Sequence, residues 1–430
     1  MTDILVYGLL FGLLAAMPFA KEENRFFILF TGIVTFPIGI AFKQSPTIRP
    51  MDLFLYGFFF IEIVQNPQKV IESAKTIPLK LPLVLIFVSH ILSTGLSSGF
   101  GMKNIYTVFR EFFELYGFLF AAYLSMRNCS LNDLAKKLFP LTLILCILGI
   151  LEVVLQGNYP YTVICSAFPI YTGYYTLDHI VSMIQDWRIR TMITTAHPTA
   201  LGTLLGSLTI LYICQWKNLK KKSPLTTLTV LLLTINLILC GSRTAMLTTF
   251  IGILFIFLHK KSGFVKIFFA GISFFLVAFG TAIIIQKFSN ESQGSSFGLR
   301  QRQLIFSAVQ IANSPIFGNG VGATKNIFEY DDSGRPINDS DIGGLESIVF
   351  RQLIDYGFVG LASFYFFAFC LFWNFYKKRD QEKNLFATAT TISVLIFFTL
   401  SGLIGNNGAF AFLILGSLLN SKVPSLESSS

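Results

Sequence analysis

Residues 225–258 read LTTLTVLLLTINLILCGSRTAMLTTFIGILFIFL, two apolar runs joined by a short turn that carries one arginine. Neither run contains a charged residue. Each is a little shorter than the roughly 20 residues that a helix needs to cross the hydrocarbon core of a bilayer. The stretch therefore predicts a pair of short membrane helices with Arg243 at the turn between them.

The rest of the chain has a similar composition. Of its 430 residues, 53% are hydrophobic and 13% are charged, and the mean hydropathy is +0.64. Soluble domains carry about 25% charged residues, so a soluble enzyme, a disordered scaffold and a disulfide-stapled secreted domain are all excluded. We expect an all-α polytopic membrane protein with about 12–13 transmembrane helices. Its apolar runs lie at about 4–19, 26–42, 51–64, 82–97, 109–126, 138–156, 196–215, 225–240, 244–258, 264–285, 356–373, 384–403 and 407–420.

The distribution of positive charge predicts which loops share a side of the membrane. The formal net charge is +10, and lysine and arginine gather in three short links between apolar runs: 217–222, 260–266 and 377–383. All three fall on one side if the segments alternate, and the positive-inside rule makes that side the cytoplasm. The stretch 157–195, the turn at 240–243 and the segment 286–355 then face outward.

Four regions follow from this topology. Residues 1–156 hold the N-terminal transmembrane helices, and 157–285 form a transmembrane core that includes the outward loop 157–195. Residues 286–355 form one large extracytoplasmic loop, and 356–430 hold the C-terminal helices and a short tail. The topology also predicts that the functional site faces the outside.

The segment 286–355 is the part of the chain with soluble composition. Ser296 is expected to cap a helix from about 298 to 312, which ends before Pro315. The sequence Gly318-Asn-Gly-Val-Gly322 predicts a structural turn and not a phosphate-binding loop, because no Gly-Lys-Ser/Thr follows it. A second helix is expected to begin near Leu345 and to continue into the span at 356–373.

Arginines at the outer membrane level are the leading candidate site residues. Placing an arginine inside the hydrocarbon costs about 2.5–3.5 kcal/mol of insertion free energy. An arginine at this level is therefore a candidate functional residue. Guanidinium groups carry permanent charge and forked donors that fit phosphate oxygens. Ordinary arginines that reach up to lipid headgroups are the alternative, and it stays open for Arg188. The candidates for a phosphate site are Arg190, Arg243, Arg300 and Arg302, with Arg188 and Arg110 as further positions.

Other polar residues have a structural as well as a functional interpretation. Arg110 and Glu114 are four residues apart and predict a helical ion pair, with a role in acceptor binding as the alternative. His197 precedes Pro198, so it is a candidate base or a residue that begins a helix. The other histidines show no ligand spacing, so neither a metal nor another cofactor is expected. No basic cluster lies in a soluble module, so no nucleic-acid partner is expected.

The order of these motifs resembles the O-antigen polymerase and O-antigen ligase superfamily of bacterial envelope glycosyltransferases. The resemblance covers about 186–365 and rests on the Arg190 stretch, the Ser242-Arg243-Thr turn and a large outward loop. That loop begins with Arg300-Gln-Arg302, continues through Ser314-Pro-Ile-Phe-Gly-Asn-Gly-Val-Gly322 and ends with Leu353-Ile-Asp-Tyr-Gly-Phe-Val-Gly-Leu361. The family usually has a histidine where the loop re-enters the membrane, and this chain has Glu346 there.

The resemblance implies a metal-independent, membrane-embedded glycosyltransferase of GT-C-like architecture. Its donor would be a polyprenyl-pyrophosphate-linked glycan, its acceptor a glycan or a lipid, and its other partners membrane lipids and a chain-length regulator. Glu346 or His197 would be the base, and Arg190, Arg243, Arg300 and Arg302 would bind pyrophosphate.

The function we expect is an inverting polymerase of a surface polysaccharide, of the O-antigen or capsule type, in the bacterial inner membrane. The main alternative is a ligase that moves finished glycan from polyprenyl pyrophosphate to lipid A-core of lipopolysaccharide or to another acceptor. A glycolipid exporter or flippase is a more distant alternative, because the chain lacks a visible internal repeat.

Overall fold

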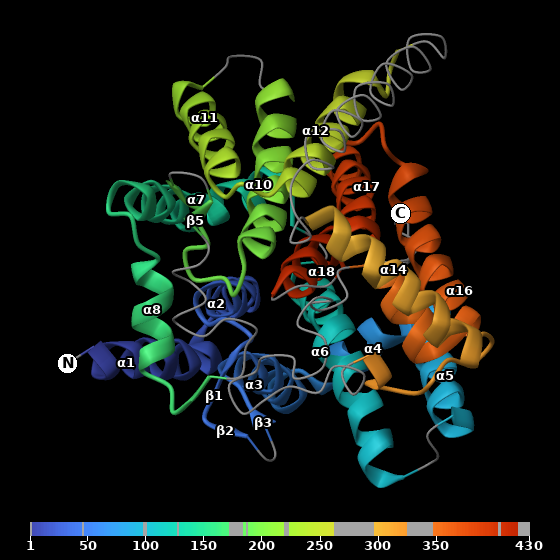
Figure 1. Cartoon of the computed structure of the whole chain (residues 1–430). Coiled ribbons are helices and arrows are strands. Elements are labelled where there is room, and N and C mark those ends of the chain that lie inside the picture. Colours follow the sequence, from blue (N-terminus) through green and yellow to red (C-terminus); the bar gives the residue numbers. More distant parts are fainter. Residues whose placement is uncertain are drawn as a thin grey trace, which may run out of the picture.

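Helices make up nearly all of the computed structural model (Figure 1), which describes residues 2–44, 47–97, 101–126, 129–171, 184–185, 188–218, 223–261, 296–324, 347–402 and 406–419. The N-terminal half contains α1 (Thr2–Ala16), the 3-10 turn η1 (Met17–Phe19), α2 (Glu22–Thr35), α3 (Pro50–Gln65), α4 (Pro67–Thr76), α5 (Lys80–Ser97), α6 (Met102–Met126), α7 (Leu131–Val154) and α8 (Tyr159–Ser166). The C-terminal half contains α10 (Pro198–Asn218), α11 (Pro224–Leu239), α12 (Arg243–Leu258), α14 (Ser296–Asn313), α16 (Ile348–Tyr376), α17 (Glu382–Ser401) and α18 (Asn407–Leu418).

Strands are confined to three antiparallel pairs in the described residues. The pair β2 and β3 (Lys43–Gln44, Thr47–Ile48) forms a hairpin, as does the pair β5 and β6 (Ile184–Gln185, Arg188–Ile189). The third pair, β1 with β4 (Ile40–Ala41, Ile170–Tyr171), joins the connections that follow α2 and α8. None of these strands is long enough to build a layer, so the molecule is a helical bundle with small hairpins at its edge.

Six described helical segments are long and apolar enough to cross a membrane, and they start at Thr2, Lys80, Leu131, Pro198, Ile348 and Glu382. Shorter apolar helices lie beside them, among them α11 and α12, which form the predicted pair of short helices. The chain is an all-α multi-pass membrane protein, as predicted. The number of 12–13 spans stays a prediction, because the run at 264–285 lies outside the described residues.

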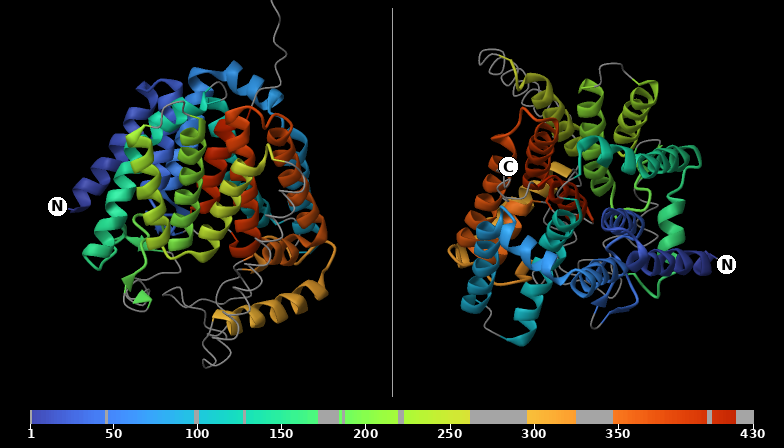
Figure 2. Two further views of the ribbon diagram at one scale, coloured as in Figure 1. Left: turned by 90° about the horizontal axis from the view of Figure 1, so that it is seen from above. Right: turned by 180° about the vertical axis from the view of Figure 1, so that it is seen from behind.

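The two ends of the bundle differ in charge. Lys217 at the end of α10 donates to the carbonyl of Ile256 near the end of α12, and the Cys214 thiol lies 3.8 Å from the carbonyl oxygen of Glu382 at the start of α17. The described parts of the three basic links therefore share one end, as predicted, and we call it the basic end. The opposite end, where α10 and α12 begin and α14 lies across the upright helices, we call the loop face (Figure 2).

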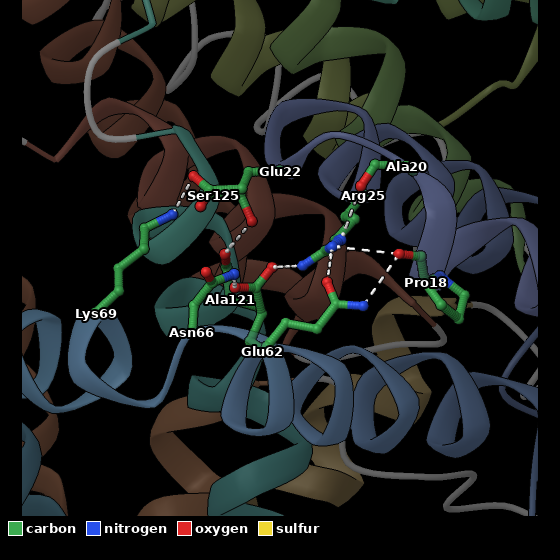
Figure 3. Close-up of polar contacts among 10 residues, drawn as sticks. Pro18, Ala20, Glu22, Arg25, Glu62, Asn66, Lys69, Ala121 and Ser125 are labelled. Carbon is green, nitrogen blue, oxygen red and sulfur yellow. Dashed lines mark hydrogen bonds and ion pairs between the residues drawn. The ribbon is translucent and has the colours of Figure 1, made fainter.

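A buried ion pair fixes the N-terminal helices near the basic end (Figure 3). The Arg25 guanidinium is 2.8 Å from the Glu62 carboxylate, and the two residues are 5% and 0% exposed. Arg25 also donates to the carbonyl of Ala20, 3.0 Å away, and to the Gln65 side chain. An unpaired charge at this depth would be costly, so this network fastens the connection between α1 and α2 onto α3.

The helix predicted inside the large loop is present as α14. It spans Ser296–Asn313, so Ser296 is its first residue and not a cap outside it. The second predicted helix begins at Ile348 and runs on as α16, with one break at Gly357, whose φ is 64° and ψ is −164°. Two helices were not predicted: α4 is too polar to be a membrane run, and α8 is short and lies in a stretch assigned to a loop.

Candidate functional site

Arg190 holds the turn between α11 and α12. Its Nε atom donates to the carbonyl of Cys240 at 3.2 Å, and its Nη2 atom donates to the carbonyl of Gly241 at 3.3 Å. Gly241 has a φ of 63°, and a Cβ atom there would lie 3.1 Å from the Arg190 Nε atom. Glycine is favoured at such a left-handed position. Arg190 thus fixes the geometry of the turn that presents Arg243, with part of its guanidinium used for this purpose.

Arg243 is the first residue of α12 and is exposed at the loop face. The Ser242 side chain caps the helix by accepting from the backbone N–H of Ala245 at 3.4 Å. The Arg243 guanidinium forms no hydrogen bond or ion pair with the residues that the structure describes. Because a helix N-terminus carries partial positive charge, this position combines a full and a partial charge that both attract an anion.

Close packing of α10 against α12 keeps this turn in place. A Cβ atom on Gly202 would lie 2.7 Å from the Cβ atom of Ala245, and one on Gly206 would lie 2.2 Å from the Thr249 hydroxyl oxygen. Small residues four apart allow such close approach between membrane helices. The starts of α10 and α12 are therefore adjacent at the loop face.

His197 caps the start of α10. Its Nδ1 atom accepts the backbone N–H of Thr199 at 3.1 Å and also contacts the Thr199 hydroxyl, while its own carbonyl accepts from the Thr195 hydroxyl. These contacts fit the interpretation of His197 as a residue that begins a helix. Its role as a base stays a prediction.

The remaining candidates lie in three places. Arg110 pairs with Glu114, as its spacing predicts, and also with Asp52 at 3.3 Å, so it belongs to a network between α3 and α6. Arg188 lies in the hairpin strand β6. Arg300 and Arg302 belong to the first half of α14, which starts near the middle of the bundle and runs out to α16 (Figures 1 and 2). Glu346 and the side chains of Arg300 and Arg302 lie outside what the structure describes.

Two glycine-containing motifs of the large loop pack backbone against backbone. The N–H of Asn319 donates to the carbonyl of Ile354 at 2.7 Å, and that of Gly320 donates to the carbonyl of Asp355 at 2.9 Å. Gly318 and Gly357 have φ values of 72° and 64°, and the break in α16 at Gly357 frees its backbone for this crossing. The predicted turn at 318–322 is therefore structural, and it docks on the kink of α16.

A charged cluster that the sequence did not reveal lies under this crossing. The buried Asp355 carboxylate accepts the backbone N–H of Thr324 at 2.7 Å and the Thr324 hydroxyl. The Arg351 Nη2 atom lies 3.2 Å from the Glu111 carboxylate, which Tyr356 also contacts at 3.4 Å. The four-residue spacing of Arg351 and Asp355 was the available signal, whereas nothing in the sequence links Glu111 to them. In the described part of the chain, no three acidic, histidine or cysteine side chains form a metal-binding group.

We expect Asp355→Ala to lower the free energy of unfolding by about 1–3 kcal/mol, because the Thr324 donors lose their buried acceptor. Thermal melting of the detergent-solubilised protein measures this change. Asp380→Ala is the control, since Asp380 is exposed at the basic end and its replacement should leave the melting temperature nearly unchanged. Equal melting temperatures for Asp355→Ala and wild type would contradict the role of Asp355 as the buried acceptor of the Thr324 donors.

An apolar groove of about 330 Å³ lies beside the Arg190 segment. Leu5 and Leu9 of α1 form one wall, and Leu145 and Leu148 of α7 form another. Ile193 and Thr194, which follow Arg190 closely in the chain, also line the groove. Its hydrocarbon lining suits a lipid chain.

Comparison with known families finds a match in the C-terminal half of the chain. Residues 228–365 match the family described as O-antigen ligase. This segment is similar to that family. It includes Arg243, α14 and the contact between the Gly318 turn and the Gly357 kink, which we call the glycine crossing. Arg190 and His197 precede it. No curated protein matches the chain.

The family match over residues 228–365 confirms the resemblance to the O-antigen ligase and polymerase superfamily. It indicates a glycosyl-transferring enzyme that acts on lipid-linked glycans in a membrane.

Proposed function

We propose that the chain is a surface-polysaccharide polymerase that joins polyprenyl-pyrophosphate-linked repeat units at the loop face. One observation carries the proposal: the segment that matches the O-antigen ligase family includes the exposed, positively charged turn at Arg243. The positive-inside pattern of the three basic links supports a loop face that lies outside the cytoplasmic membrane.

In this proposal, arginines stabilise the leaving group. The acceptor sugar hydroxyl attacks C1 of the donor sugar, the bond from C1 to the pyrophosphate oxygen breaks, and the configuration at C1 inverts. Arg243, Arg300 and Arg302 bind the departing pyrophosphate, whose negative charge grows in the transition state. Polyprenyl pyrophosphate then leaves without protonation, because it is already a good leaving group.

The hydroxyl proton needs a base, and Glu346 is our candidate. A carboxylate side chain is a common general base in enzymes. His197 is the second candidate, although its Nδ1 atom is engaged at the start of α10.

The apolar groove supports a lipid-linked donor. Two of its lining residues, Ile193 and Thr194, belong to the same segment as Arg190. In this proposal the pyrophosphate binds near the Arg243 turn and the groove holds the polyprenyl chain.

A ligase is the second candidate function, because the match to the O-antigen ligase family is compatible with either activity. A ligase would use the same donor and the same arginines, with lipid A-core or another acceptor in place of a repeat unit. A transport function has less support, because the family indicates glycosyl transfer.

The surface glycan of a deletion strain, with and without the wild-type gene, tests the proposal. A polymerase predicts that the deletion leaves single repeat units on the final carrier and that the gene restores a ladder of lengths. Long polymer stranded on polyprenyl pyrophosphate would mean a ligase. An unchanged glycan would contradict both.

A further inference from the structure

Glu152 is a buried carboxylate in the last turn of α7. It is 1% exposed, and its Oε2 atom accepts the backbone N–H groups of Met192 at 2.9 Å and Ile193 at 3.0 Å. A carboxylate is unfavourable at a helix C-terminus, where the helix dipole is negative, and costly inside a membrane bundle. Glu152 therefore does not serve its own helix, and its contacts point to the segment that it holds.

That segment has a strained backbone. Ile193 has a φ of 54°, and Gln156 is the other described non-glycine residue with positive φ. A β-branched residue rarely adopts this conformation. Such a conformation persists when surrounding contacts hold it, and strained residues of this kind cluster at functional sites. The Glu152 carboxylate accepts the N–H of Ile193 itself and of the residue before it, so it is one of the groups that hold the strained conformation.

A chain of contacts leads from Glu152 to the Arg243 turn. The Asn158 side chain donates to the carbonyl of Arg190 at 3.3 Å, and the N–H of Thr191 donates to the carbonyl of Leu239 at 3.4 Å. The Arg190 guanidinium then binds the carbonyls of Cys240 and Gly241. A displacement of residues 192–193 would therefore move Arg190 and, through it, the turn that presents Arg243.

On the other side of Ile193 the segment is fixed as well. The Thr194 hydroxyl donates to the carbonyl of Val34 near the end of α2, and His197 caps α10. Contacts with α2, α7 and the end of α11 thus hold residues 190–197, and Glu152 supplies the carboxylate among them.

We propose that Glu152 is a positioning residue for glycosyl transfer. It sets the conformation of residues 192–193, which in turn positions Arg190 and the Arg243 turn that Arg190 binds. Glu152 itself does not touch the substrate. This inference rests on the proposed function, in which the Arg243 turn binds the donor pyrophosphate.

The test compares three substitutions of Glu152 in purified protein reconstituted into liposomes with a polyprenyl-pyrophosphate-linked repeat unit as donor. Glu152→Gln keeps an oxygen acceptor at the same reach, so kcat/KM should stay within about threefold of wild type. Glu152→Ala removes the acceptor, and kcat/KM should fall about 100-fold, the loss typical of a displacement near 1 Å. Glu152→Asp shortens the side chain by one methylene, so kcat/KM should fall about 10-fold or more.

Glu62→Gln is the matched control. Glu62 is the fully buried carboxylate of the Arg25 pair near the basic end. Its substitution should lower the melting temperature and leave kcat/KM unchanged, which separates loss of stability from loss of positioning.

A Glu152→Ala variant with the kcat/KM of wild type would overturn the proposal. If the alanine variant does not fold, a Glu152→Asp variant with the kcat/KM of wild type would overturn it instead. A glutamine variant as inactive as the alanine variant would also overturn it, because the charge and not the acceptor would then be required. Arg243→Ala, measured in parallel, distinguishes this failure from failure of the proposed function. Full activity in Arg243→Ala would reject the pyrophosphate site itself.

Discussion

Arg243→Ala should abolish long surface glycan in a deletion strain that carries the variant gene. The exposed guanidinium at the start of α12 is replaced by a methyl group, and the departing pyrophosphate loses a charged partner. Removing one such group from a transition state typically costs about 10²–10³ in kcat. Arg243→Lys should give an intermediate defect, because it keeps the charge and loses the forked donor. Gel profiles of the glycan, normalised to the amount of protein in the membrane, measure both effects.

Arg379→Ala is the matched control for this experiment. Arg379 is an arginine at the basic end, where its guanidinium packs 4.0 Å from the centre of the Tyr376 ring. A role for arginine in membrane anchoring alone predicts equal effects at the two positions. Equal glycan profiles for Arg243→Ala and wild type would remove Arg243 from the site.

Gly357→Ala should prevent the accumulation of folded protein. A Cβ atom at this position would lie 2.3 Å from the carbonyl oxygen of Ile316 and 2.6 Å from the backbone nitrogen of Gly318, and the φ of 64° already disfavours any side chain. Both neighbours are backbone atoms and cannot rotate away. We expect the free energy of unfolding to fall by about 3 kcal/mol or more, measured as melting temperature or as yield in detergent.

Gly12→Ala provides the comparison. Gly12 lies on the exposed side of α1, and a Cβ atom added there would have no other atom within 4 Å. Alanine is also the better helix former, so the melting temperature of this variant should equal or exceed that of wild type. If Gly357→Ala melts like Gly12→Ala, the glycine crossing does not form as described.

The fold could be predicted largely from local patterns. Apolar runs predicted the described membrane helices, because a lipid solvent requires continuous apolar surface. Pro315 located the end of α14, and the glycines at 318–322 identified a turn. The polar helix α4 and the short helix α8 were missed, because neither has the length and hydropathy of a span.

The candidate site was less predictable, because its contacts join distant parts of the chain. Sequence patterns identified Arg243 and its turn, but not that Arg190 would bind the turn's carbonyls. The signal for Glu152 was a lone acid at the end of an apolar run. Its partners are the backbone N–H groups of Met192 and Ile193, which any residue except proline would supply, so the sequence does not indicate them.

Reconstitution of the purified protein with a single lipid-linked substrate tests the central claim most directly. Liposomes would contain the wild-type protein and a polyprenyl-pyrophosphate-linked repeat unit, with no other acceptor. The account predicts longer lipid-linked glycans and release of one polyprenyl pyrophosphate for each bond formed. Repeat units that stay unchanged until lipid A-core is added would contradict polymerisation and establish a ligase, and units that never react would contradict glycosyl transfer altogether.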